Sequence, residues 1–224
     1  MFSTSMLART TRLRDDDDSL NTLAYRRIKE KIIALELRPA SLIDENQLAQ
    51  DLQIGLTPIR QALRRLAQDK LVVILPRRGT IVADLNPADL TKIFEIRVEL
   101  EALSAQRAAE RISPDQLAQM AALAEEMKAT LTHGDPRALI ELDQQFHMLV
   151  AQAAHNEFLE ETISWLYSHV LRMWNLSLHR VQVLSTAVSE HIYIYEAIRD
   201  KECQRAAELM RQHVQHFQKE FSKL

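Results

Sequence analysis

Proline residues that directly follow good helix-capping residues divide this chain into predicted helices. The pairs Thr57-Pro58, Asn86-Pro87, Ser113-Pro114 and Asp135-Pro136 each combine an N-cap side chain with a proline at the first helical position. Proline fits that position because its missing N–H would have no acceptor within the helix and its φ angle is already helical. These four pairs therefore predict four helix starts.

The sequence after residue 86 has the apolar spacing of helices throughout and shows no strand signal. The predicted helices cover roughly residues 87–111, 114–132, 136–154, 156–179, 184–200 and 202–222. Segments of this length and spacing bury one face each when they pack against one another. We therefore expect an all-α bundle of six or seven helices.

The sequence before residue 86 mixes helical and strand patterns. The predicted elements are, in order, a helix (20–36), a short strand (41–43), a brief helix (44–54), a helix capped by Thr57 (57–70) and a β-hairpin (71–85) formed by LVVIL and TIVADL around PRRG. This order is that of a winged helix-turn-helix. The predicted fold is mostly α, with this winged domain followed by the helical bundle.

Charge and histidine content also differ between the two regions, although the whole chain has a formal charge of −3. Residues 1–85 hold 14 Lys and Arg against 11 Asp and Glu, and residues 86–224 hold 14 against 20. All eight histidines lie in the second region. We expect a disordered tail (1–18) and two domains (19–85 and 86–224) with different partners.

A single cysteine, Cys203, excludes an internal disulfide framework, and no stretch resembles a signal peptide or a membrane span. These features predict a soluble protein of the cytoplasm.

The helix predicted from residue 57 has a basic face. Arg60 and Arg64 are four residues apart and share that face, with Gln61 and Arg65 beside it. The apolar residues of the opposite face are Ile59, Ala62, Leu63 and Leu66. The PRRG turn adds two further cations, Arg77 and Arg78. A solvated basic face with an ordinary turn is the alternative, but in a winged helix-turn-helix this pattern favours binding to DNA phosphates and base edges.

The segment SLIDENQLAQDLQIGLTPIRQALRRLAQDKLVVILPRRGTIVADL closely resembles the DNA-binding domain of GntR-family transcription regulators. That family has a T-P-(V/I)-R-x-A-L-x-x-L recognition helix before an R-G-x-x-V wing. The resemblance implies operator contacts from Arg38, Thr57, Arg60, Arg64, Arg78 and Gly79. Leu56 stands where the family commonly has arginine, so the operator sequence does not transfer from relatives.

Four residues of the second region form a candidate metal site. Asp143 and His147 are four apart on one predicted helix, His191 lies near the start of the next but one, and His213 lies in the last. One carboxylate and three imidazoles suit Zn²⁺, Ni²⁺ or Mn²⁺. The alternative is chance, because isolated histidines more often serve as surface or core polar groups.

The second region also resembles the FadR C-terminal (FCD) ligand-binding domain. FEIRVELEALSAQRAAER is similar to the first helix of that domain, which carries R-x-x-L-E. Its metal-binding members have a D-x-x-x-H motif followed by two further histidines that are 22 positions apart. His191 and His213 have the same separation here. The resemblance implies that Asp143, His147, His191 and His213 are the ligands. The remaining histidines are interpreted as surface or structural, with His216 the easiest to mistake for a ligand: His133, His155, His169, His179 and His216.

An FCD-type regulator implies an effector, for which we expect a small organic acid beside the metal. Arg97 is the first candidate to neutralise it, because Leu100 and Leu103 mark the predicted core side of its helix and the resemblance places an arginine there. Arg172 is the second candidate. The alternative for Arg97 is an ordinary surface pair with Glu101, one turn on.

The function predicted from the sequence is that of a homodimeric regulator, a repressor or activator, that binds a pseudo-palindromic operator. The rival hypothesis is a helical metalloenzyme with a DNA-binding appendage. The sequence has neither H-E-x-x-H nor the duplicated E-x-x-H of di-iron bundles, which counts against that rival.

Overall fold

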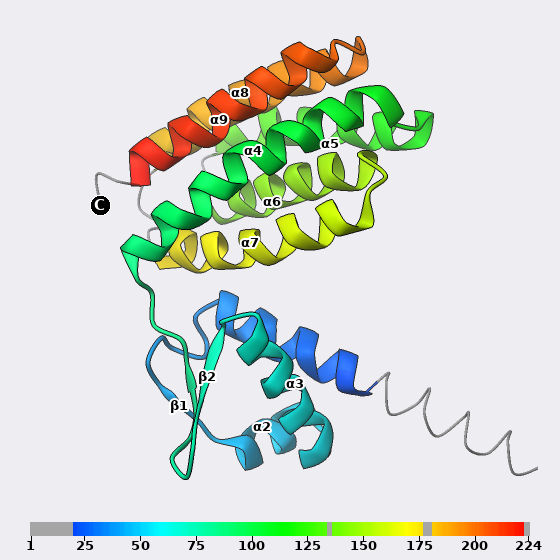
Figure 1. The fold of residues 1–224 in the computed structure, drawn as a ribbon. Helices are drawn as coiled ribbons and strands as arrows, with labels where there is room; N and C mark the ends of the chain where they lie inside the picture. Colours follow the sequence, from blue (N-terminus) through cyan, green and yellow to red (C-terminus); the bar gives the residue numbers. More distant parts are fainter. Residues whose placement is uncertain (1–19, 134–135, 177–180, 222–224) are drawn as a thin grey trace, which may run out of the picture. The chain divides into compact units, whose positions relative to one another are not determined.

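The computed structural model describes residues 20–133, 136–176 and 181–221 of the 224-residue chain. Its contacts divide into two compact units, Met1–Leu85 and Asn86–Leu224. The tail predicted over residues 1–18 lies outside the described residues. The described part of the chain is mostly helical, with strands in the first unit only, as predicted (Figure 1).

The first unit has the order of elements of a winged helix-turn-helix. It comprises a helix over residues 20–33, then β1 (Leu42–Ile43), α2 (Glu45–Leu52), α3 (Leu56–Gln68), β2 (Val72–Leu75) and β3 (Gly79–Val82). The strands form one antiparallel sheet in the order β1-β3-β2. Ile81 of β3 pairs with Leu42 on one side and with Val73 on the other.

The first helix ends three residues earlier than predicted. Leu35 adopts a left-handed backbone conformation with φ of 60°, and its N–H bonds to the Ile32 carbonyl at 3.3 Å. The N–H of Leu37 then bonds back to the Lys31 carbonyl at 3.1 Å. This closes the end of the helix, since a left-handed residue satisfies the last carbonyls but cannot continue the spiral.

The start of α3 also differs from the prediction. The N-cap is Gly55, the helix begins at Leu56, and Thr57 is therefore not the cap. Pro58 consequently lies within the first turn rather than at its first position. Proline is tolerated there because none of the first four N–H groups of a helix has an acceptor inside the helix.

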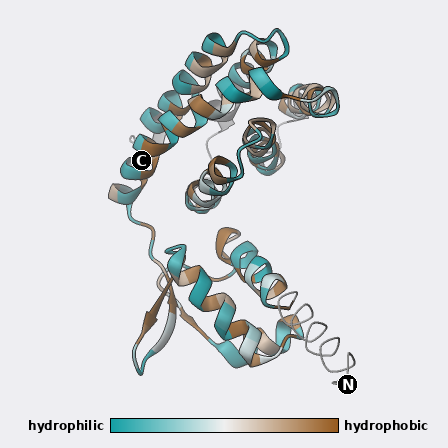
Figure 2. Cartoon of the chain, turned by 45° about the vertical axis from the view of Figure 1, so that its right-hand side comes forward, coloured by the Kyte–Doolittle hydropathy of each residue, from teal (hydrophilic) through white to brown (hydrophobic). Residues whose placement is uncertain are grey.

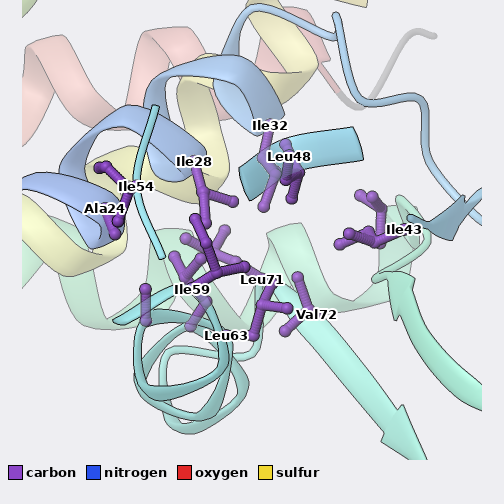
Figure 3. Packing of buried hydrophobic residues seen from close by; sticks show 13 residues of the cluster. Ala24, Ile28, Ile32, Ile43, Leu48, Ile54, Ile59, Leu63, Leu71 and Val72 are labelled. Carbon is purple, nitrogen blue, oxygen red and sulfur yellow. The ribbon is translucent and has the colours of Figure 1, made fainter. Parts of the chain in front are cut away.

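The core of the first unit is formed by apolar side chains from every element (Figure 3). Ala24, Ile28 and Ile32, at successive intervals of four, are fully buried on one face of the first helix. Ile59 and Leu63 of α3 meet this face, as the apolar spacing predicted. α3 is thereby held by its apolar side, and its polar side is left at the surface.

The hairpin between β2 and β3 turns at Pro76, Arg77 and Arg78. Gly79 follows with φ of 94°, and a Cβ atom built there would lie 3.3 Å from Leu42 Cδ1. A side chain at this position would therefore be strained by the backbone and crowded by β1. The glycine has a structural reason within the sheet, besides any approach to DNA.

The second unit consists, in its described part, of six helices. They are α4 (Pro87–Arg111), α5 (Pro114–His133), α6 (Pro136–Ala153), α7 (Glu157–Leu176), α8 (Val181–Arg199) and α9 (Cys203–Phe221). Asn86 caps α4 by accepting a 3.0 Å bond from the Ala88 N–H. Ser113 and Gln116 form a reciprocal capping box at the start of α5, with bonds of 3.2 and 3.1 Å. These helix starts agree with the cap–proline predictions, and α8 begins about three residues before its predicted start.

α4 contacts α6, α7, α8 and α9, so it runs through the centre of the bundle. Each helix of the bundle carries both hydrophobic and hydrophilic residues along its length (Figure 2). Large side chains fill the interior, among them Phe94, Met120, Phe146, Tyr167 and Met210, each no more than 1% exposed. Among the described residues, no helix combines the length and apolar character that a membrane crossing requires.

Candidate metal centre and DNA-binding surface

Four potential metal ligands meet inside the bundle. Asp143 and His147 come from α6, His191 from α8 and His213 from α9, and all four are buried. One ligand atom from each lies within 4.8 Å of the others. His191 lies in the third turn of α8 rather than at its start, because that helix begins at Val181. Four residues separated by up to 70 positions in the sequence therefore converge on one point.

The distances within the cluster suit a single ion. The three Nε2 atoms are separated by 3.1 Å (His191–His213), 3.2 Å (His147–His213) and 3.4 Å (His191–His147). Asp143 Oδ1 lies 3.4 Å from His191 Nε2 and 3.8 Å from His147 Nε2. At a metal–nitrogen distance of about 2.0–2.1 Å, neighbouring ligand nitrogens lie roughly 3.0–3.4 Å apart. The residues present therefore fit a metal.

The protonation of His191 favours the same conclusion. Burial lowers the pKa of His191 well below its usual value, and the neighbouring His213 and His147 lower it further. A neutral imidazole with its proton on Nδ1 presents a lone pair at Nε2. Such a lone pair on His191, which lies 3.1 and 3.4 Å from the Nε2 atoms of His213 and His147, favours a cation between the three nitrogens.

Carboxylates outside the cluster orient two of the ligands. His213 Nδ1 lies 2.7 Å from Glu190, and His147 Nδ1 contacts Glu101. A carboxylate at Nδ1 keeps the proton on that nitrogen and frees Nε2 for a metal. Glu190 also bonds to Nδ1 of His216 at 2.6 Å, and the His216 side chain is 57% exposed. His216 therefore supports the cluster from outside and is not one of the converging side chains.

Arg97 and Glu101 form an ion pair beside the cluster, with Arg97 Nε 2.5 Å from Glu101 Oε1. Both side chains are buried, so this is not the surface pair considered as the alternative. Burial alone would raise the pKa of Glu101, but Arg97 and His147 outweigh it and hold that pKa at about 2. The expected core side of α4 needs correction. Leu103 is 37% exposed, and Phe94 and Val98 are buried instead.

A narrow pocket adjoins the ligand cluster. Its lining residues are Arg97, Asp143, His147, Tyr167, Trp174, His213, Val214 and Phe217. The Tyr167 hydroxyl donates to Asp143, and the Arg97 guanidinium lies 4.8 Å from the centre of the Tyr167 ring. Arg172, the second effector candidate, is buried but is not among the lining residues.

Sequence reasoning missed several residues of this site, namely Glu101 as an inward-facing group, Glu190, Tyr167 and Trp174. Tyr167 and Trp174 are seven residues apart and so share one face of α7. That spacing was visible in the sequence, but apolar spacing alone does not tell a pocket wall from ordinary core.

The first unit exposes the residues predicted to contact DNA. Arg60, Gln61 and Arg64 lie on the exposed face of α3, and Thr57 is exposed in its first turn. Arg78 is exposed at the tip of the hairpin, next to Gly79. Arg38 is exposed in the loop before β1, where its carbonyl accepts a 2.6 Å bond from the Ser41 hydroxyl.

Two of the arginines of α3 are engaged within the unit. Arg60 Nε bonds to Glu45 at 2.7 Å. The Arg65 guanidinium lies 4.0 Å from the centre of the Tyr25 ring, and the Tyr25 hydroxyl donates to Asp69 at 2.6 Å. Arg65 is thereby stacked against the first helix, whereas Arg60 remains on the exposed face.

Comparison with known proteins identifies both units. Residues 20–82 match the gntR family of bacterial regulatory proteins, and residues 92–216 match the FCD domain. This chain is a GntR-family transcriptional regulator with an FCD domain. The resemblance seen in the sequence is confirmed, and with it a DNA-binding function for the first unit.

The relatives of this GntR regulator belong to the same class. An uncharacterized HTH-type transcriptional regulator of Bacillus subtilis, YdhC, is 28% identical over 86% of this chain and 86% of its own length. The HTH-type transcriptional repressor RspR of Escherichia coli is 26% identical over 88% and 86%. The structure of E. coli McbR/YncC has the same fold, with a TM-score of 0.80 at 21% identity over 91% of this chain and 97% of that one. The families and relatives are regulators rather than enzymes, which confirms that this GntR protein is not one.

Proposed function

We propose that this regulator is a homodimeric repressor whose operator binding is controlled by a small carboxylate bound beside a divalent metal in the FCD domain. The observation that carries the proposal is the position of Arg97, which lines the same narrow pocket as three of the four candidate ligand residues. Relatives named as repressors, RspR and GlaR, support repression. We expect the protein to act in the cytoplasm.

The first unit supports the DNA-binding half of the proposal. α3 presents Arg60, Gln61 and Arg64 on a face that fits the major groove, with its apolar face fixed in the core. Contacts from Thr57, Arg38, Arg78 and Gly79 to the operator would set the register of this helix on the duplex. A twofold dimer calls for a pseudo-palindromic operator with one α3 helix in each half-site.

The second unit supports a metal held by Asp143, His147, His191 and His213. One carboxylate and three neutral imidazoles suit Zn²⁺, Ni²⁺ or Mn²⁺. A bound ion of this kind supplies positive charge and a coordination position for an oxygen ligand. Because the ligands come from α6, α8 and α9, the ion would also join three helices of the bundle.

The side chains that line the pocket suit an anion, and the pocket, at about 10 Å³, would have to widen to admit one. Among the described residues, Arg97 makes its side-chain hydrogen bond through Nε only, so its two terminal nitrogen groups contact aromatic rings but have no hydrogen-bond acceptor. These groups form a planar fork that matches the two oxygens of a carboxylate. Tyr167 and Trp174 line the same pocket and supply its aromatic walls.

The charges of the site point the same way. Arg97 and Glu101 cancel one another, and a divalent ion would exceed the charge of Asp143 by one, because imidazoles that ligate a metal are neutral. Glu190, which contacts His213, is outside this sum because its side chain is 21% exposed, so the fully buried residues of the site would carry one uncompensated positive charge, which is costly away from water. A carboxylate in the pocket would balance it. Arg172 does not line the pocket, so Arg97 is the arginine that would bind the carboxylate.

Control of DNA binding follows from unequal affinity. The acid would bind one arrangement of the dimer more tightly than the other, and only this difference can release or strengthen operator binding. An acid that contacts Arg97 and the metal at once could distinguish two arrangements of α4 relative to α6, α8 and α9.

Native mass spectrometry of the untagged full-length protein tests the proposal as a whole. We expect a dimer that carries one metal ion per subunit and releases a retained small acid on unfolding. Fluorescence anisotropy on a duplex selected by the protein from a randomised library, repeated with a panel of hydroxy, dicarboxylic and sugar acids, then tests control. If every acid of the panel leaves the affinity for the duplex unchanged on metal-loaded protein, carboxylate control is wrong.

A further inference from the structure

Glu45 of α2 and Arg60 of α3 face each other across the turn that joins the two helices. Glu45 Oε2 accepts a 2.7 Å hydrogen bond from Arg60 Nε. The Glu45 side chain is 27% exposed and that of Arg60 is 60% exposed. Glu45 occupies the first turn of α2, which is anchored by the Asp44 cap, and its buried neighbour in that helix is Leu48. The acceptor thus stands on a fixed support.

The three arginines of α3 differ in how they are held. Among the described residues, Arg64 has no ion-pair or hydrogen-bond partner, and Arg65 stacks on Tyr25. Among the described residues, the Arg60 side chain is bound at Nε alone, so one edge of its guanidinium is fixed while the side chain as a whole stays largely exposed. An arginine that is held in this way has already lost much of its rotamer freedom before any partner binds.

We propose that Glu45 is a positioning residue that orders Arg60 for operator recognition, and the inference rests on the proposed entry of α3 into the major groove. Two N–H donors in a fixed plane can address the O6 and N7 acceptors of a guanine together. If Glu45 orders the guanidinium in the free protein, the entropy cost of ordering it does not reduce the affinity for DNA. Arg64 has no such support and is better suited to phosphate contacts, which do not require a fixed orientation of the side chain.

The charge of Glu45 makes this idea separable from simple electrostatics. A carboxylate on a DNA-facing surface repels phosphates, so its removal by itself strengthens binding to any duplex. Loss of positioning acts in the opposite direction, and only on the duplex whose bases Arg60 reads. Loss of the repulsion therefore strengthens binding to both duplexes, whereas loss of positioning lowers the ratio of specific to non-specific affinity.

The test compares full-length wild type with Glu45→Gln, which keeps the shape of the side chain and removes its charge. The probes are the duplex that wild type selects from a randomised library and a scrambled duplex of the same composition. We expect selectivity between them to fall about 2- to 10-fold, the range for ordering one long side chain. Affinity for the scrambled duplex should be unchanged or higher. Asp51→Asn removes the same charge from the other end of α2, where Asp51 bonds only to Gln47 among the described residues, and should keep wild-type selectivity.

Double mutants decide the mechanism. The loss of selectivity caused by Glu45→Gln should vanish in an Arg60→Ala background and persist in an Arg64→Ala background. The melting temperature should stay close to that of wild type, because exposed ion pairs contribute little to folding. If Glu45→Gln shows lower stability, Glu45→Asp at wild-type stability provides the same comparison with the acceptor withdrawn by one carbon.

Two results overturn the inference. Unchanged or increased selectivity in Glu45→Gln refutes positioning, and so does a loss of equal size in the Arg60→Ala background. If instead α3 does not enter the major groove, Arg60→Ala alone would bind the selected duplex as wild type does, which distinguishes failure of the proposed function from failure of the positioning role.

Discussion

Arg97 and Glu101 pair one helical turn apart on α4 with both side chains buried, and Glu101 also contacts the candidate ligand His147. On the outer face of the same helix, Glu99 pairs with Arg211 of α9 at 3.1 Å, and there the Glu99 side chain is 68% exposed. Two glutamates of α4 therefore pair with arginines in opposite environments, and burial should decide how much each pair contributes.

Glu101→Gln should destabilise the bundle strongly. It removes the carboxylate that pairs with the buried Arg97 guanidinium, and breaking a buried ion pair typically costs about 3–5 kcal/mol. Both tryptophans, Trp165 and Trp174, lie in the second unit, so their fluorescence follows unfolding of the bundle alone. Denaturant titration of chelator-treated protein measures the free energy of unfolding without a metal contribution.

Glu99→Gln is the exposed control, since exposed pairs are worth about 0–1 kcal/mol and Arg211 also keeps its second partner, Glu208. Equal losses in the two variants would mean that burial of the Arg97–Glu101 pair has no energetic consequence.

Removal of metal should lower the melting temperature of the bundle. A ligand at about 1,000 times its Kd stabilises the folded state by roughly 4 kcal/mol, and a chelator takes that contribution away. His191→Ala should abolish the sensitivity to chelator because it deletes a ligand, whereas the exposed neighbour of the site, changed as His216→Ala, should keep it. Untagged protein that is metal-free as purified and insensitive to added Zn²⁺, Ni²⁺ and Mn²⁺ would contradict the metal assignment.

The helices of this regulator were predictable because their starts have local causes. Asn86 and Ser113 act on N–H groups within three residues of themselves, so the sequence contains both partners of each cap. The start of α3 was misplaced because a glycine N-cap makes no side-chain bond and leaves no comparable signal.

The candidate ligands were found for a different reason. Asp143 and His147 share one helix face, and the separation of His191 from His213 matched a known family. The supporting acids had no such signal. Glu101 and Glu190 are two of 31 acidic residues, and nothing local distinguishes an acid that meets a histidine of another helix from one that faces water. Their roles depend on packing between helices, which spacing along one helix does not report.

Arg60→Ala and Arg64→Ala should each weaken operator binding. A bidentate contact to a base is worth about 1–3 kcal/mol, and a lost phosphate contact lowers the slope of log affinity against log salt by about one. Anisotropy titrations across a range of salt concentrations separate the two kinds of contact. Arg205→Ala removes an exposed cation that is paired with Glu202 in the other unit, and it should change neither quantity. Near-wild-type affinity in both α3 variants would refute the recognition surface.

The effector pocket should respond to organic acids through Arg97. On metal-loaded protein, thermal-shift screening should show stabilisation by small hydroxy, dicarboxylic or sugar acids and not by their amides, because the fork of Arg97 needs an anionic partner. Arg97→Lys keeps the positive charge beside Glu101 but replaces the planar fork by a single ammonium group. That variant should therefore remain folded and lose most of the shift produced by acids, whereas Arg97→Ala also strands the buried Glu101 and should be far less stable. A chelated wild-type sample should respond weakly as well, since the acid would then lack the ion that takes its oxygen. Stabilisation by neutral compounds alone, or an undiminished response to acids in Arg97→Lys, would show that the pocket does not recognise a carboxylate through this arginine.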